Sequence, residues 1–250
     1  MSKENLLVPV GYYCGPFFTD PEDFPDYWQV RIGRATFELP TYDALNMWFQ
    51  ARGVVGDDNE IDHGRESVVA AAEKAGVRGA RVVLNQLMDA GLVIEIGSAD
   101  WPLERFCSTY SLQPLMVGIG NLSQNHDKYL LGLDQAHVYT MLDDQGYDVW
   151  VWTHLSRTIH DAAEDNMKIV DSVTIARQMR RLCRVGADLV THSAAYFDLA
   201  MGVPQQLSGA TADDSFAGVP PIPPVIPPEA AGGANAAPPA DDSDDYDDGF

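Results

Sequence analysis

Basic residues are scarce in this chain. Its 250 residues include 16 Lys and Arg against 37 Asp and Glu, which gives a formal net charge of −21. Residues 202–250 hold nine acids and no Lys or Arg, so residues 1–201 still carry a net charge of −12. A body of this charge repels the phosphate backbone, and any contact with nucleic acid has to use a local basic patch.

Cysteines and long apolar runs are also few. The three cysteines, Cys14, Cys107 and Cys183, are odd in number and far apart, which argues against a disulfide framework and suits a reducing compartment. No stretch approaches the ~18 apolar residues that a membrane-spanning helix needs. The N-terminus, broken by Pro9 and Gly11, does not resemble a signal peptide. We therefore expect a soluble cytoplasmic protein with no membrane contact.

Catalytic and metal-binding motifs are missing as well. None of the histidines belongs to a His-x-x-x-His pair, a spacing that holds zinc on a helix. Gly118 and Gly120 resemble part of a phosphate-binding loop without its Lys and third Gly, and we interpret them as a turn between strands. Cys183 falls on an apolar helix face, where a thiol is a core residue. Asp143 and Asp144 are interpreted as solvated acids at a helix end. We expect no enzyme activity, cofactor or metal.

The sequence does contain a regular succession of strand and helix patterns. Alternating apolar residues predict strands, and apolar residues at helical spacing, with Thr41 as N-cap and Gly53, Gly76 and Gly91 as terminators, predict helices. The first 26 residues, rich in Pro, Gly and aromatics, are interpreted as an irregular arm. The predicted order is strands at 28–32 and 35–39, helices at 41–53, 65–75 and 79–90, and a strand at 92–96.

The same order is predicted to occur again. Residues 41–53 and 134–146 both begin with a capping residue and close on Gly. The third helices share the spacing of their apolar residues and of a terminating Gly: Leu84, Leu87, Met88 and Gly91 match Met179, Leu182, Cys183 and Gly186. Chance agreement is the alternative, since all amphipathic helices have one period. In the second copy we expect strands at 128–131 and 147–154, core positions for Trp150 and Trp152, and helices at 160–165 and 172–185, the last capped by Asp171 or Ser172.

The C-terminal part differs in composition. Residues 203–240 are mainly Pro, Ala, Gly and Val, with PPIPPVIPP at residues 220–228. Such a segment buries too little apolar surface to offset its ordering entropy, and its Pro run favours a polyproline II spacer. Two strands, three helices and a closing strand are the arrangement of a winged helix. The fold class is therefore predicted to be α+β, with an irregular arm at 1–26, tandem winged-helix-like domains at 27–100 and 101–201, and a disordered Pro-rich acidic tail at 202–250.

Four arginines lie in the predicted third helix of the second copy. Arg177, Arg181 and Arg184 are spaced at i, i+4 and i+7, so they share one outer face, and Arg180 lies beside them. In a winged helix the third helix enters the major groove, where Arg binds guanine edges or phosphates. These residues therefore predict contact with duplex DNA. The alternative is an exposed helix face on which the arginines are solvated or paired with nearby acids.

The acidic tail ends in an aromatic residue. A terminal ring can fill a pocket in a partner while basic residues around that pocket bind the carboxylates. The segment DDSDDYDDGF resembles the C-terminal tip of bacterial single-stranded DNA-binding proteins, although Gly249 stands where a Pro is expected, and the resemblance covers ten residues. It implies a partner protein with a basic-rimmed hydrophobic pocket. The alternative is a tail that only improves solubility. The predicted partner-binding residues are Asp244, Asp245, Tyr246, Asp247, Asp248 and Phe250.

The predicted first copy resembles a second family. Two strands, a capped helix ending in Gly, another helix and the pattern LxxLxxxGL at residues 84–92 are similar to PqqD-type peptide-recognition domains. The resemblance covers residues 28–96 and, less clearly, 128–191. These small winged-helix modules bind a leader peptide by strand addition beside a helix, so the resemblance implies peptide binding.

Three functions are compatible with the sequence. The first is a non-enzymatic DNA-associated protein, regulatory or accessory to replication, whose tail recruits a partner or competes with DNA for the arginines. The second is a protein- or peptide-binding adaptor, which an acidic body suits. The third is an assembly or structural component of a phage or mobile element. We favour the first, because the arginine cluster and the replication-like tip point to the same process.

Overall fold

In the computed structural model, the described part of the chain forms seven helices and several antiparallel sheets, which confirms the predicted α+β class. The structure describes residues 5–20, 24–97, 99–167 and 174–202, which all belong to a unit spanning residues 1–218. No helix in these ranges is long and apolar enough to cross a lipid bilayer. The predicted disordered tail lies outside the described residues.

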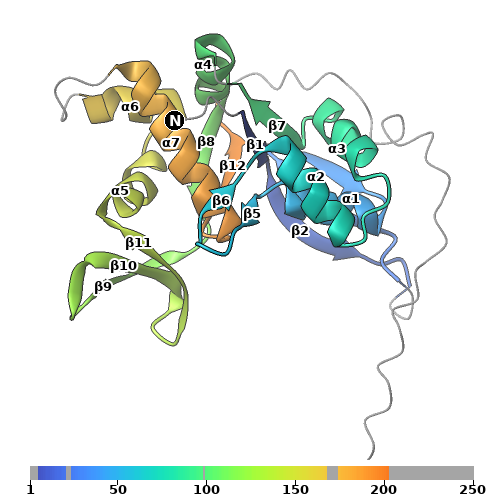
Figure 1. Ribbon diagram of the computed structural model, residues 1–250, viewed down its shortest axis with the longest axis horizontal. Coiled ribbons are helices and arrows are strands. Elements are labelled where there is room, and N and C mark those ends of the chain that lie inside the picture. Colours follow the sequence, from blue (N-terminus) through green and yellow to red (C-terminus); the bar gives the residue numbers. More distant parts are fainter. Residues whose placement is uncertain (1–4, 21–23, 98, 168–173, 203–250) are drawn as a thin grey trace, which may run out of the picture. The chain divides into compact units, whose positions relative to one another are not determined.

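The first half of the chain contains a three-stranded antiparallel meander, β2–β3–β4, and three helices, after which β7 returns to pair with β1 (Figure 1). Side chains alternate along β3, and Trp28, Val30 and Ile32 are buried on one face. Thr41 caps α1 as predicted, since its hydroxyl accepts a hydrogen bond from Ala44 N at 3.1 Å. The elements are β1 Leu6–Pro9, β2 Tyr12–Phe17, β3 Tyr27–Ile32, β4 Ala35–Leu39, α1 Tyr42–Gln50, β5 Val54–Val55, β6 Ile61–Asp62, α2 Arg65–Lys74, α3 Ala80–Asp89 and β7 Val93–Ile96.

The second half has the same order of elements after a linking helix, α4. A strand, β8, is followed by the antiparallel meander β9–β10–β11, three helices and a strand, β12, that returns to pair with β8. The elements are α4 Asp100–Thr109, β8 Tyr110–Pro114, β9 Val117–Leu122, β10 Asn125–Asp134, β11 His137–Asp143, α5 Asp144–Thr153, α6 Ile159–Met167, α7 Ile175–Thr191 and β12 Ala195–Leu199. Apart from the short strands β5 and β6, which have no counterpart among the described residues of the second half, the order of elements therefore occurs twice. The winged-helix character of each half stays a prediction.

The predicted alignment of the two copies is wrong for the first helix. Residues 134–146, matched to α1, form mostly β11, and residues 147–154, predicted to be a strand, belong to α5. Asp143 caps α5, since its carboxylate accepts a hydrogen bond from Gly146 N at 2.8 Å. The aromatic residues suggested a strand because aromatics favour pleated surfaces, but Tyr147 and Trp150 stack three positions apart on one helical face.

The third helix is longer than predicted. Gly186 was expected to end it, but α7 continues to Thr191 and ends where Ser193 has a φ of +56°. A Cβ added at Gly186 would lie 3.0 Å from Cζ of Phe197 on β12. Gly186 therefore allows close packing of helix against strand. The cap is Thr174, whose hydroxyl accepts from Arg177 N, and the predicted caps at positions 171 and 172 lie outside the described residues.

Two segments predicted to be irregular are strands. The N-terminal arm contains β1 and β2, which pair with β7 and β3. Gly118 and Gly120, predicted to be in a turn, lie within β9. Pro and Gly misled the prediction because both are usually found in turns, whereas here Pro9 lies at the end of β1 and Gly11 reverses the chain before β2 with a φ of +101°.

Strand β12 connects the two halves. The Phe197 carbonyl accepts a hydrogen bond from Gly11 N at 2.8 Å, and Val10 forms a parallel bridge with Phe197. The Asp198 carboxylate accepts another from Gly33 N at 2.6 Å. The last strand of the described residues is therefore held by backbone groups of the first half.

Helix α7 makes further polar contacts with the first half. His63 Nε2 lies 2.9 Å from Asp188 Oδ1, although His63 is only 1% exposed. Arg52 donates to the Ser193 hydroxyl at 2.8 Å, its carbonyl accepts from the Thr191 hydroxyl, and burial lowers the pKa of its guanidinium to about 10. The halves are thus joined by polar contacts as well as by one continuous apolar core.

Two of the three cysteines lie in that core. Cys107 on α4 and Cys183 on α7 are buried, with their Sγ atoms 3.4 Å apart, while Cys14 is exposed. This confirms the predicted core position of Cys183.

We expect Gly11→Ala to be less stable than Gly15→Ala. Both glycines have positive φ, +101° and +108°, so a Cβ costs about 1–2 kcal/mol at either position. At Gly11 this Cβ would lie 2.6 Å from Val30 Cγ1 and 2.8 Å from Arg31 O, whereas at Gly15 it meets nothing within 4 Å. The crowding should cost about 2 kcal/mol more at Gly11, which urea denaturation measures. Equal stabilities would contradict the close approach of the β1–β2 link to β3.

Candidate interaction surfaces

Helix α7 has the buried face that its sequence predicts. Met179, Leu182 and Cys183 are 1–3% exposed and face the core, while Ile175 is partly buried against it. The opposite side of the helix carries the four arginines that predicted DNA binding.

Two of these arginines contact other parts of the protein. Arg180 forms an ion pair with Asp100 at the start of α4. Arg184 donates from Nη2 to the Ile61 carbonyl of β6 at 2.7 Å, and its Nε lies 3.8 Å from Asp188 Oδ1. The charge of each is therefore shared with an acid or a carbonyl, which reduces the attraction that it offers to a phosphate.

The other two arginines differ in exposure. Arg177 is exposed, and its side chain forms no ion pair or hydrogen bond with the described residues. Arg181 is half-buried, and its Nε atom is buried without a hydrogen-bond partner in the same part of the chain. The four arginines thus lie on one helix, as predicted, but they do not share one environment.

The corresponding arginines of the first half are paired with acids. Arg78 Nε lies 3.3 Å from Asp43 Oδ2. Arg81 donates to both carboxylate oxygens of Glu66, a contact that raises the pKa of Arg81 and lowers that of Glu66. In both halves, two of the arginines on or beside the third helix are paired with acids: Arg78 and Arg81 in the first half, and Arg180 and Arg184 in the second.

A different surface lies on the meander β9–β10–β11. Figure 1 shows this sheet extending beyond α6 and α7, with α5 next to it. Of the sixteen exposed large apolar side chains among the described residues, seven lie in this sheet or in the segment after it, and six lie between Tyr12 and Val55. Among the described residues of the sheet, Leu131 is the only large apolar side chain that is buried. The seven exposed ones are Val117, Leu133, Val138, Tyr139, Met141, Trp152 and Leu155.

The two tryptophans of α5 have different roles. Trp150 is partly buried and packs against the core, as predicted. Trp152 is 55% exposed, so its predicted core position is wrong. On a strand, residues 150 and 152 share a face, whereas on a helix they are about 200° apart. The exposure of Trp152 follows from the helical structure of α5.

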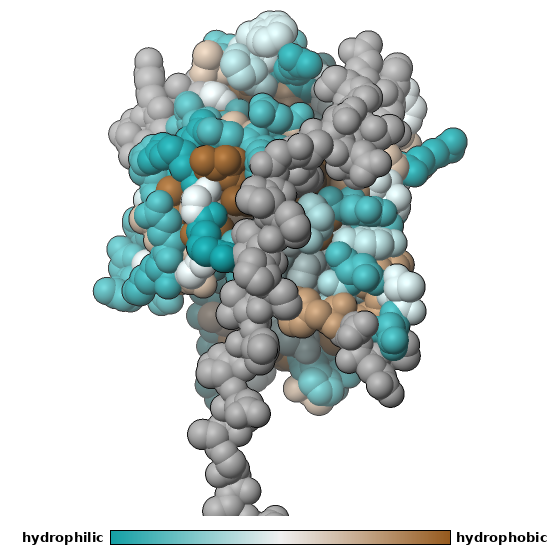
Figure 2. Space-filling model, turned by 90° about the vertical axis from the view of Figure 1, so that its right-hand side faces the viewer, coloured by the Kyte–Doolittle hydropathy of each residue, from teal (hydrophilic) through white to brown (hydrophobic). Residues whose placement is uncertain are grey.

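The side of the molecule formed by α1, α2 and α3 has a different character. Figure 2 shows hydrophilic groups over most of the described surface on this side, with apolar groups in a few separate areas. Val82 on α3 is an isolated example, 60% exposed. Single apolar residues of this kind are normal on a protein surface.

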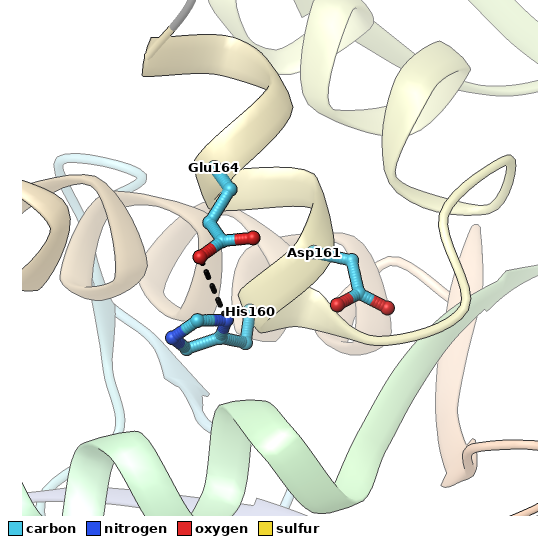
Figure 3. Close-up of side chains that lie close together, drawn as sticks. All are labelled: His160, Asp161 and Glu164. Carbon is cyan, nitrogen blue, oxygen red and sulfur yellow. Dashed lines mark ion pairs between the residues drawn. The ribbon is translucent and has the colours of Figure 1, made fainter.

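One cluster on α6 combines metal-ligand side chains. The ligand atoms of His160, Asp161 and Glu164 lie within 4.8 Å of one another. His160 Nδ1 is 3.9 Å from Glu164 Oε1, and Asp161 Oδ2 is 3.5 Å from Arg157 Nε. Figure 3 shows Glu164 directed toward the His160 ring and Asp161 to the side. This cluster, in which His160 and Glu164 have the spacing His-x-x-x-Glu, was not predicted from the sequence. All three ligands come from neighbouring turns of one helix, with Glu164 exposed and the other two partly buried, and such contacts stabilise a helix surface without any ion.

The predicted partner-binding residues of the tip, from Asp244 to Phe250, lie outside the described residues. In comparisons with known proteins, no family model, no curated protein and no solved structure matches the chain. The resemblances to PqqD-type domains and to the tip of single-stranded DNA-binding proteins therefore stay predictions.

Arg184→Ala should destabilise the protein, and Arg177→Ala should not. Arg184 loses a hydrogen bond from a charged donor to the Ile61 carbonyl, and because its side chain is 53% exposed we expect a loss of about 1 kcal/mol in the free energy of unfolding. Arg177 is exposed, so its truncation should change this value by less than ~0.5 kcal/mol. Urea denaturation compares the two, and a larger loss for Arg177→Ala would contradict the contacts described for α7.

Proposed function

We propose that the protein is a non-enzymatic, protein-binding adaptor whose second half carries the main binding surface. The observation that carries this proposal is the concentration of seven exposed, large apolar side chains between Val117 and Leu155. Apolar residues gathered on one region of a surface are typical of protein interfaces.

The surroundings of these apolar residues favour protein over nucleic acid. Between Val117 and Asp148 the chain has five Asp and a single Lys, Lys128, a net charge of −4. Phosphates are repelled by such a surface. Apolar groups with an acidic rim suit a protein partner that supplies apolar and basic side chains.

The resemblance to PqqD-type domains supports the same proposal. Those modules bind a peptide by strand addition, and a three-stranded meander such as β9–β10–β11 has two edge strands. The acidic tip is proposed as a second contact, with a protein that has a basic-rimmed hydrophobic pocket for Phe250.

A pull-down from cells that contain the protein tests the adaptor proposal. We expect the wild-type chain to capture at least one protein that Met141→Lys loses, because a charge at a half-exposed position of β11 opposes an apolar contact. Val82→Lys is the matched control, since Val82 is similarly exposed but lies on α3. Deleting Phe250 should remove a different protein. If Met141→Lys retains every protein that Val82→Lys retains, the sheet is not the binding surface.

Binding to duplex DNA is the second candidate function, because Arg177 is exposed on the helix that a winged helix inserts into the major groove. Under this proposal a duplex binds with an affinity that falls steeply with salt. Removing residues 203–250, which carry nine acids, should tighten binding. Arg177→Glu should weaken binding more than the control Arg34→Glu, since Arg34 is also exposed but lies in the turn between β3 and β4. Fluorescence anisotropy with a labelled duplex measures these changes, and undetectable binding at ~50 mM salt by the shortened chain rejects the proposal.

A further inference from the structure

The two faces of the β9–β10–β11 meander differ. On one face Tyr129 stacks on Tyr147 of α5, with ring centroids 4.0 Å apart. A Cβ added at Gly118 would lie 3.4 Å from ring atoms of Tyr147 and Trp150. The helix α5 therefore covers this face.

The opposite face is open. Alternation along the strands places Leu130 there, between its partners Met141 on β11 and Gly120 on β9. A Cβ added at Gly120 would meet nothing within 4 Å, and Met141 is 52% exposed. A row of apolar and small residues thus crosses this face of the sheet, and none of the described helices is shown to cover it. In the first half the middle strand β3 has three large side chains buried, whereas β10 has Leu131.

The edge formed by β11 is suited to pairing with another strand. Within the described ranges β11 pairs with β10 alone, and its four residues Thr140 to Asp143 are in regular register with Leu131 to Lys128. The strand HVYTMLD has no Lys, Arg or Pro, the residues with which natural proteins protect an edge. Both edge strands have two register shifts in their pairing with β10. The edge formed by β9 is less suitable because Gly120 within it has a φ of +112°.

The negative charge around β11 indicates which kind of partner this edge attracts. Asp127, Asp134, Asp143 and Asp144 are all exposed on the meander or directly after it, and Asp134 contacts His137 at 2.8 Å. A second copy of this chain would bring the same acids and a body of net charge −12 against them. A basic segment has the opposite charge and is attracted.

We propose that the edge of β11 binds a basic, amphipathic segment of a partner protein as a fourth strand. Its backbone pairs with β11, alternate apolar side chains cover Leu130 and Met141, and its Lys or Arg side chains contact the aspartates of the meander. This inference rests on the proposed adaptor function and names the chemistry of the partner.

Two synthetic peptides test the proposal on the full chain. One alternates Lys and Val over nine residues, and the other alternates Glu and Val over the same length. We expect the Lys peptide to bind at least tenfold more tightly in fluorescence anisotropy, and to protect backbone amides of β11 from hydrogen exchange. Equal binding of the Glu peptide, or protection located outside β11, overturns the proposal.

Variants separate the sheet from the acidic tail, which can also attract a basic peptide. Met141→Lys and the uncharged Met141→Ser should each weaken binding of the Lys peptide, the first by tenfold or more, while Val82→Lys should leave it within twofold. Unchanged binding by both Met141 variants means that the peptide is held elsewhere and overturns the proposal.

Sedimentation of the wild-type chain and of Met141→Lys tests whether a second copy of the chain, rather than a basic segment, covers the sheet. The proposal expects the same monomeric species for both. A wild-type dimer that Met141→Lys dissociates overturns it, because a second copy then covers the sheet. If the pull-down shows a partner lost with Met141→Lys while the Lys peptide fails to bind, the adaptor function stands and the basic-strand partner is rejected.

Discussion

The buried carboxylate of Asp198 is the polar group on which the junction of the two halves depends. It is 7% exposed, accepts hydrogen bonds from Gly33 N at 2.6 Å and Leu199 N at 2.9 Å, and pairs with Arg31 at 3.6 Å. A carboxylate in such a position is tolerated only when donors surround it. Strand β12 also pairs with β8, and its Phe197 carbonyl accepts a hydrogen bond from Gly11 N. Because β8 and Gly11 directly precede the two meanders in the chain, this one strand contacts the start of both.

The two halves have the same order of elements and differ in burial. In the first half the middle strand contributes Trp28, Val30 and Ile32 to the core, and α3 has its neighbouring cations paired with acids. In the second half the meander is covered by α5 on one face. The middle strand of the first half therefore contributes more to the apolar core than the middle strand of the second half, where Leu131 is the buried large apolar side chain.

Much of the fold was predictable where the signals are local. The Thr41 cap and the apolar spacing of α3 identified helices of the first half, because cap and stripe are set by residues within a few positions of one another. The prediction failed for α5, where aromatic residues suggested a strand, and for Gly186, which serves packing against Phe197. The partners of Arg180 and Arg184 lie 80 and 123 positions away in the sequence, and spacing along one helix contains no information about them.

The contact between Cys107 and Cys183 allows chemical modification of these two thiols to report the separation of α4 from α7. The hydrogen bond with Cys107, together with burial, raises the pKa of the Cys183 thiol, and a protonated, enclosed thiol does not react with alkylating reagents. The exposed Cys14 is accessible at once. The rate at which the two inner thiols become modified therefore measures how often α4 separates from α7, and so the local stability of the core beneath the arginine helix.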